Sequence, residues 1–267
     1  MLKNMTSVQS LVLAVVEGLT EYLPVSSTGH IILTSWALGI HQEPFVKDYT
    51  VMVQFGAIMA VVWLYWRRFV LNVRLYPKVL AAFLPVVAIG LAVKKHVEAL
   101  LESVTVVGWA LLVGGVLLVL TDHWVRKLKI RVRALEEMPT TSALQVGLFQ
   151  CLALIPGTSR SAATIWGGLY QGMTLPLATE FSFFLAVPTL TGAGLLELRK
   201  VWSTLSPEQW QILLWGNVAS FVVGALTIRS FVRVVERFGL RHFGYYRIAV
   251  GAFVLILLAL GKDLQVL

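Results

Sequence analysis

Two carboxylates stand inside an apolar stretch near the start of the chain, and they are the first residues that indicate chemistry. Glu17 and Glu21 are four residues apart, so a helix would place both on one face. A carboxylate at membrane depth costs roughly 2.5–3.5 kcal/mol on insertion scales, so a pair is expected to face a cation, a partner or a cavity. The pair therefore predicts a functional site.

A proline and a group of polar residues follow the carboxylates. Pro24 is expected to end the helix that carries Glu17 and Glu21, because the residue before a proline disfavours helical geometry. The next helix would begin with Ser26, Ser27 and Thr28, which have N-cap chemistry. His30 follows Ser27 by three residues, so it can share a face with that hydroxyl in the first turn and converge with it on the carboxylates. A hydroxyl, an imidazole and two carboxylates are groups that nucleophilic and acid–base catalysis use.

A second polar cluster, at 156–161, interrupts another apolar stretch. Gly157 allows close approach of the backbone to a ligand, and Arg160 presents a planar fork suited to phosphate oxygens. Three hydroxyl donors surround them: Thr158, Ser159 and Ser161. Together with the amino-terminal ends of two helices, these residues predict an anion site.

The carboxylates beside this anion site suggest a divalent cation that bridges carboxylate and phosphate, as Mg²⁺ or Ca²⁺ would. Glu17 and Glu21 are its expected ligands. The simplest ligand for the whole site is a phosphate or diphosphate attached to a lipid. Gln54 and Glu180, near the starts of two later apolar runs, are weaker candidates for supporting residues.

The composition defines the kind of protein that must position these residues. The chain has 267 residues, of which 57% are hydrophobic and 13% charged, against about 25% charged in a soluble domain. The apolar runs are continuous, which predicts an all-α integral membrane protein. The net charge of +8 is therefore assigned to loops that flank membrane spans, not to a nucleic-acid surface. The single cysteine, Cys151, allows no internal disulfide.

Six apolar runs are long enough to be transmembrane helices. Two further regions, 8–40 and 143–175, are apolar but interrupted by the two polar clusters, so each half is too short to cross a membrane. They are expected to form re-entrant helical hairpins. The six spans are expected at about 50–66, 79–93, 104–120, 178–196, 209–229 and 245–261.

The basic residues predict a topology with both termini outside. Thirteen of them fall in three segments between spans, and seven fall in the opposite loops and the termini. With this topology, Leu23-Pro-Val-Ser-Ser27 and its echo 132 residues later, Ile155-Pro-Gly-Thr-Ser159, belong to inverted repeats. We expect one membrane domain, 1–267, built from repeats at roughly 8–120 and 143–261.

Simpler roles for the same residues are alternatives. Hydroxyls in membrane helices often bond backbone carbonyls, and a membrane histidine is often only hydrogen-bonded. The carboxylate pair could belong to a proton or cation pathway, and Arg160 could merely neutralise one of the carboxylates. Alternatively, the same anion cage could serve a lipid-phosphate transporter or flippase that performs no chemistry.

Three motifs carry a resemblance to a known family. The stretch from Glu17 to His30 resembles a signature of the bacterial undecaprenyl-diphosphatase, or bacitracin-resistance, family; 149–161 resembles its second signature and 180–188 a third stretch. The resemblance covers nearly the whole chain. It implies a bacterial inner-membrane enzyme with six spans and two re-entrant segments. This enzyme removes one phosphate from undecaprenyl diphosphate for cell-wall synthesis and requires a divalent cation.

The resemblance also implies where the site lies. The acidic motif falls on Glu17 and Glu21, the hydroxyl and imidazole on Ser27 and His30, and the arginine on Arg160. We expect Ser27 to attack phosphorus with His30 as general base; His30 as nucleophile, or a water it activates, are the variants. Ala162 stands where the family usually has glycine. A homodimer is an alternative to a single chain.

Overall fold

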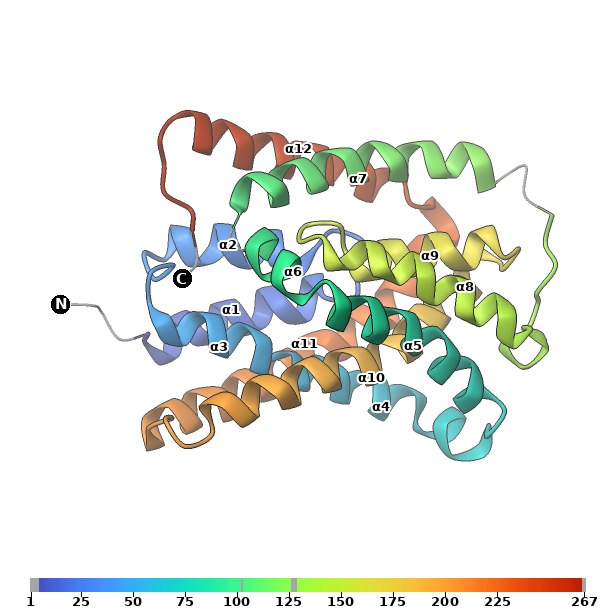
Figure 1. Cartoon of the computed structure of the whole chain (residues 1–267), viewed down its shortest axis with the longest axis horizontal. Helices are drawn as coiled ribbons and strands as arrows, with labels where there is room; N and C mark the ends of the chain where they lie inside the picture. The colour runs from blue at the N-terminus through green and yellow to red at the C-terminus, as the bar shows by residue number, and fades with distance from the viewer. Residues whose placement is uncertain (1–4, 102, 126–128, 266–267) are drawn as a thin grey trace.

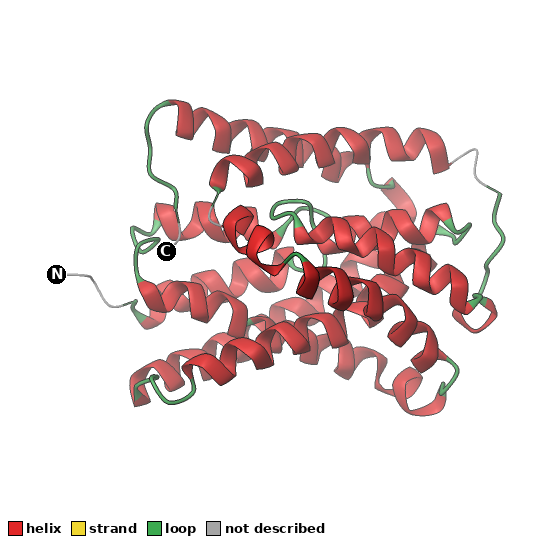
Figure 2. Ribbon diagram, in the orientation of Figure 1, coloured by secondary structure: helices red, strands yellow, loops and turns green. Residues whose placement is uncertain are grey.

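The computed structural model describes residues 5–101, 103–125 and 129–265, and every regular element in these ranges is helical (Figures 1 and 2). Six of the helical segments are long and apolar enough to cross a membrane, which confirms the all-α class and the number of spans predicted. The six segments are Pro44–Leu71 (α3, Pro44–Met52, continued by α4, Gln54–Leu71), Leu75–Ala92 (α5), Val104–Val125 (α7), Leu175–Val201 (α10), Pro207–Phe238 (α11) and Arg241–Ala259 (α12).

Two regions form pairs of short helices, as the interruptions in their sequences predicted. The first pair is α1 (Ser7–Thr20) and α2 (Ser27–Ala37). The second is α8 (Thr140–Gln150), extended by the 3₁₀ helix η2 (Cys151–Leu154), and α9 (Arg160–Tyr170). Short elements connect the rest: α6 (Lys94–Leu101) precedes α7, and the 3₁₀ helix η1 (Leu135–Glu137) precedes α8.

The two helix pairs enter the bundle from opposite ends, and the two termini lie at the same end (Figure 1). The tips of the pairs therefore meet in the interior, halfway along the long helices. The bonds between these tips, described below, join residues 139 positions apart in the chain. This meeting point is where the two polar clusters come together.

The long helices pack around the tips in matched pairs. α1 packs on α11 and α8 packs on α5, while α7 lies against α12 and α4 against α10. The first helix of each short pair thus rests on a long helix from the other half of the chain. Gly18 allows the contact between α1 and α11, because a Cβ there would lie 2.9 Å from the carbonyl oxygen of Ser220. Small residues permit such close approach between membrane helices.

An aromatic core closes the site from one side. Phe181, Phe183 and Phe184 of α10 are fully buried, and Phe183 meets the ring of Tyr22 edge-on with centroids 5.5 Å apart. The Tyr22 hydroxyl donates to the carbonyl oxygen of Ala57 at 2.6 Å. This packing fixes the residue next to Glu21 against two of the long helices.

Candidate active site

The two breaks share an unusual backbone conformation. Ser26 precedes α2 with a φ of 70°, and Ser159 precedes α9 with a φ of 72°. They are the two residues other than glycine with positive φ among those described. Such a conformation costs on the order of 1–3 kcal/mol and persists only where the surroundings hold it. The sequence echo pairs Ser159 with Ser27, 132 residues earlier. In the structure, the residue equivalent to Ser159 is Ser26, 133 residues earlier.

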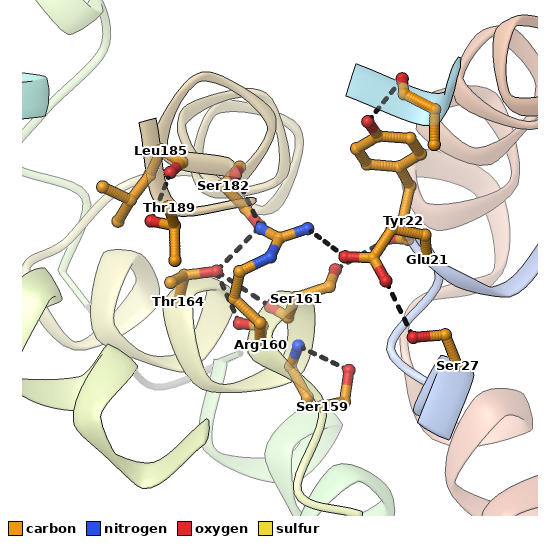
Figure 3. Close-up of polar contacts among 12 residues, drawn as sticks. Glu21, Tyr22, Ser27, Ser159, Arg160, Ser161, Thr164, Ser182, Leu185 and Thr189 are labelled. Atoms are coloured by element: carbon orange, nitrogen blue, oxygen red, sulfur yellow. Dashed lines mark hydrogen bonds and ion pairs between the residues drawn. The ribbon is translucent and has the colours of Figure 1, made fainter. Parts of the chain in front are cut away.

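A line of polar contacts joins the two tips through Glu21 (Figure 3). The Ser27 hydroxyl donates to Oε2 of Glu21 at 2.7 Å. Nη2 of Arg160 donates to Oε1 of the same carboxylate at 3.1 Å. The side chains of Arg160 and Glu21 are only 9% and 6% exposed, so this ion pair is shielded from water. A hydroxyl, a carboxylate and a guanidinium from both halves of the chain therefore meet.

Arg160 is held from its other side by α10. Nη1 donates to the carbonyl oxygen of Ser182 at 3.0 Å, and the Ser182 hydroxyl accepts from Thr164 at 2.7 Å. The Nε of Arg160 is buried and has no partner. The guanidinium is thus fixed in orientation while it keeps one donor for a further acceptor.

Glu17 lies beside this line with an unsatisfied oxygen. Its side chain is buried, and its Oε1 has no hydrogen-bond partner. Glu21, Gln54 and Arg160 are all close enough to interact with its carboxylate. A buried carboxylate oxygen without a partner is costly and calls for a proton or a cation.

The donor set fits a divalent cation that is completed by substrate. No group of three or more histidine, cysteine or acidic side chains suited to a metal occurs among the described residues. Mg²⁺, however, is commonly held by one or two carboxylates together with substrate phosphates. Glu17 offers a free carboxylate oxygen, whereas both oxygens of Glu21 already accept hydrogen bonds. The residues present therefore fit a cation held mainly by Glu17.

His30 lies next to the site, but both of its ring nitrogens bond groups other than Ser27. Nδ1 is 2.7 Å from the carbonyl oxygen of Ser26, and a carbonyl can only accept, so Nδ1 carries the proton. In the neutral ring, Nε2 then accepts from the Tyr246 hydroxyl, also at 2.7 Å. The His30 and Tyr246 rings are stacked, with centroids 5.5 Å apart. The acceptor nearest to the Ser27 hydroxyl is therefore Glu21.

The remaining hydroxyls of the second tip have structural partners. Ser161 donates to the carbonyl oxygen of Tyr22 at 2.7 Å and so ties one tip to the other. Ser159 caps α9 by accepting from the amide of Ala162 at 3.2 Å. Ala162 is fully buried, so its methyl group is accommodated in the core. At the first tip, Ser26 is buried and Thr28 is exposed.

Gly157 is needed for approach to the protein itself. Its φ is +90°, and a Cβ there would lie 2.6 Å from the carbonyl oxygen of Val107 in α7. Thr158 contributes its carbonyl oxygen to a buried arginine described below. Gly157 and Thr158 therefore help to hold the second tip in place.

Glu180 does not join the site. Its carboxylate pairs with Arg68 near the end of α4 at 2.7 Å, and that arginine is half exposed. Glu180 therefore supports the end of α4 through Arg68, and it does not belong to the site at the tips.

The sequence interpretation missed two consecutive residues of α12. Tyr246 holds His30, and Arg247 is fully buried and donates to backbone carbonyls of both tips. One signal was available: apart from Arg160, Arg247 was the only basic residue that fell in neither a loop nor a terminus. An arginine inside a predicted span marks a functional or structural centre.

An apolar groove of about 660 Å³ opens beside His30. Leu23 and Val25 of the first tip form one wall, and Val234 and Phe238 of α11 form another. Tyr246 lines the groove with its ring while its hydroxyl bonds His30. The groove is therefore formed by α1, the first tip, α11 and α12, and it borders the residue that bonds His30.

The fold and the site define a polytopic helical membrane protein with a buried, charged centre where two interrupted helices meet. The chain belongs to the family described as bacitracin resistance protein BacA, whose profile matches residues 10–253. It is similar to the undecaprenyl-diphosphatase of Bdellovibrio bacteriovorus, with 47% identity over 98% of this chain and 99% of that protein. It is also similar to the undecaprenyl-diphosphatases of Flavobacterium johnsoniae (43% identity, 95% and 96% covered) and Porphyromonas gingivalis (strain W83; 40% identity, 98% and 100% covered).

Proposed function

We infer that this protein is an undecaprenyl-diphosphatase, which hydrolyses undecaprenyl diphosphate to undecaprenyl phosphate and inorganic phosphate. It thereby returns the lipid carrier to cell-wall synthesis. The observation that carries the inference is the line from Ser27 through Glu21 to Arg160. It supplies a nucleophile, a proton acceptor and a cationic group at one buried point, in a chain that matches diphosphatases over almost its full length.

We propose that Ser27 attacks the terminal phosphorus. As the Ser27 oxygen bonds to phosphorus, its proton passes to Oε2 of Glu21, and the bond from that phosphorus to the bridging oxygen breaks. Undecaprenyl phosphate leaves with the bridging oxygen. Arg160, through its free Nε and the Nη groups, stabilises the charge that spreads over the phosphoryl oxygens.

Water then attacks the phosphoserine, which releases inorganic phosphate, and a proton returns to the Ser27 oxygen. Glu21 and His30 are the two groups in reach of the tip that can move this second proton. The variants in which His30 is the nucleophile, or activates water directly, require its Nε2 to leave the Tyr246 hydroxyl. The contact between Ser27 and Glu21 requires no such rearrangement.

A divalent cation, Mg²⁺ or Ca²⁺, completes the proposal. When bound, it would supply positive charge to the diphosphate oxygens and lower the cost of bringing them beside Glu17 and Glu21. The unsatisfied Oε1 of Glu17 supports this role. Ser26, Thr28 and the amino-terminal end of α9 would provide further contacts to the phosphates.

The polyprenyl tail is proposed to leave the site through the apolar groove lined by Leu23, Val234 and Phe238. This route keeps the diphosphate at the tips while the tail remains in contact with the bilayer. The groove is apolar, and it is lined in part by Tyr246, which bonds His30.

We propose that the two helix pairs are re-entrant and that the chain is an inverted repeat. The opposite entry of the pairs, the matched packing of the long helices and the strained serine at each tip support this arrangement. With the basic loops inside the cell, both termini would face outward from the bacterial inner membrane. Light scattering in detergent would reveal a homodimer.

The central test is release of inorganic phosphate from undecaprenyl diphosphate by purified protein in detergent, with and without a chelator. Hydrolysis that stops with the chelator and returns with Mg²⁺ or Ca²⁺ supports both the activity and the cation. Ser27→Ala is the control for contaminating phosphatases. Binding of the lipid without phosphate release would instead indicate a lipid-phosphate flippase, which the relatives' names do not favour.

A further inference from the structure

Arg247 sits where both interrupted helices and α7 converge. It is fully buried, and its two terminal nitrogens donate to four backbone carbonyls and to no side chain. The acceptors come from the first tip, the second tip and α7: Pro24 (3.2 Å), Thr158 (2.9 Å), Gly157 (2.9 Å) and Ala110 (3.0 Å). One guanidinium therefore joins three segments that are distant in sequence.

The carbonyls that Arg247 holds adjoin the strained serines. Pro24 is two residues before Ser26, and Thr158 directly precedes Ser159. Each serine in turn precedes a residue of the site, Ser27 or Arg160. Positive φ at these serines sets the direction in which α2 and α9 leave the tips, so the contacts of Arg247 bear directly on where Ser27 and Arg160 lie.

The surroundings of Arg247 suit a planar guanidinium better than an ammonium group. A planar group with several fixed donors can serve carbonyls on different sides at once, whereas an ammonium is a single point of donation. Gly114 of α7 provides the space, because a Cβ at that position would overlap Nη2 of Arg247. α7 and α12 lie side by side (Figure 1). Gly114 and Arg247 are in contact across this pair of helices.

We propose that Arg247 is a positioning residue that holds the two tips in register, so that Ser27 from one and Arg160 from the other act on the same phosphoryl group. This role rests on the proposed diphosphatase function. It differs from a general contribution to folding, because it acts on the turnover of molecules that are already folded. A displacement of about 1 Å between reacting groups can cost about 100-fold in rate.

The first test disturbs the contacts of Arg247 with the two tips in two different ways. Arg247→Lys keeps the charge but cannot serve four carbonyls, and Gly114→Ala keeps the arginine but displaces it. For undecaprenyl diphosphate, we expect kcat per folded molecule to fall about 100-fold in Arg247→Lys and about 10-fold in Gly114→Ala, with KM within about 3-fold of the original value. Val254→Ala, a buried cavity variant on the same helix, is the control that lowers melting temperature without a loss of kcat.

The second test measures the tips without using activity. After Cys151→Ala, spin labels at Val15 of α1 and Ile155 of the second tip, both exposed, report the distance between the helix pairs. The protein should give one narrow distance distribution, and the distribution should broaden or shift in Gly114→Ala. This measurement applies even if Arg247→Lys fails to fold or the protein releases no phosphate.

Two outcomes would overturn the proposal. One is a distance distribution that is the same in Gly114→Ala as in the original protein. The other is an activity per folded molecule in Arg247→Lys and Gly114→Ala that matches Val254→Ala. Absence of phosphate release by the original protein would refute the proposed function instead, and the distance measurement would still decide whether Arg247 aligns the tips.

Discussion

The Ser27 hydroxyl and the Glu21 carboxylate form a 2.7 Å hydrogen bond across the first break, and Arg160 of the second break holds the other oxygen of that carboxylate. This relationship gives Glu21 two contacts: it accepts from the proposed nucleophile, Ser27, and it pairs with the guanidinium of Arg160. The carboxylate is therefore the point at which the two halves of the chain become one site.

The nucleophile can be identified by comparing Ser27→Ala with His30→Ala. If Ser27 attacks phosphorus, Ser27→Ala should lower kcat at least about 1,000-fold with little change in melting temperature, since the side chain is small and partly exposed. His30→Ala should be less severe, because Ser27 bonds Glu21. Mass spectrometry of protein quenched during turnover should detect phosphate on Ser27. A Ser27→Ala protein that retains a tenth of its turnover would exclude the covalent route.

Tyr246→Phe tests the partner of His30 separately. The substitution removes the 2.7 Å hydrogen bond to Nε2 and keeps the stacked ring. A loss of about 3- to 10-fold in kcat is expected if His30 must be held in one orientation. A severe loss, comparable to that of His30→Ala, would mean that the hydroxyl itself takes part in the reaction. An unchanged kcat would show that the hydrogen bond does not matter for turnover.

Amide substitution of the two carboxylates should change the melting temperature in opposite directions. Glu17→Gln removes a buried charge with an unpartnered oxygen, so the melting temperature should rise while activation by Mg²⁺ or Ca²⁺ is lost. Glu21→Gln leaves Arg160 without its anion, so the melting temperature should fall together with activity. Thermal unfolding and cation titrations measure both. Normal cation dependence in Glu17→Gln would contradict the proposed metal role of Glu17.

The sequence predicted the spans and the breaks because these depend on local properties. Apolar length decides which segments can cross a membrane, and prolines with hydroxyl groups mark interruptions. The partner of each side chain was not predictable in the same way. His30 was expected to serve Ser27, but its ring is held by Ser26 and by Tyr246, 216 residues away.

The same limit applies to charged residues. Glu180, at the start of a later span, was a weaker candidate for a supporting residue, yet its carboxylate pairs with Arg68 near the end of α4. Arg247 was visible as a charge inside a span, but four carbonyls from three segments define its role. Such contacts depend on how the helices pack, and a helical pattern alone does not determine that.

Substitution of Arg160 distinguishes phosphate binding from simple neutralisation of charge. Lysine can keep the pair with Glu21, but its donors all lie on one nitrogen, so it cannot reach Glu21, Ser182 and a substrate oxygen from the three separate nitrogens that arginine presents. Arg160→Lys should therefore lower kcat/KM about 100-fold while the melting temperature changes little. Arg160→Ala should lower both. Near-normal turnover in the lysine variant would indicate that Arg160 serves only to balance Glu21.

The groove beside His30 makes a prediction about substrate length. Val234→Trp should fill part of the groove, so kcat/KM for undecaprenyl diphosphate should fall about 10-fold, mainly through KM, because apolar contact with the tail is lost. A diphosphate with a short prenyl chain that ends before Val234 should be hydrolysed at nearly the original rate. Leu226→Trp, at an exposed position of the same helix outside the groove, is the matched control. Equal losses for long and short substrates in Val234→Trp, or equal effects of the two tryptophans, would show that the tail takes another path.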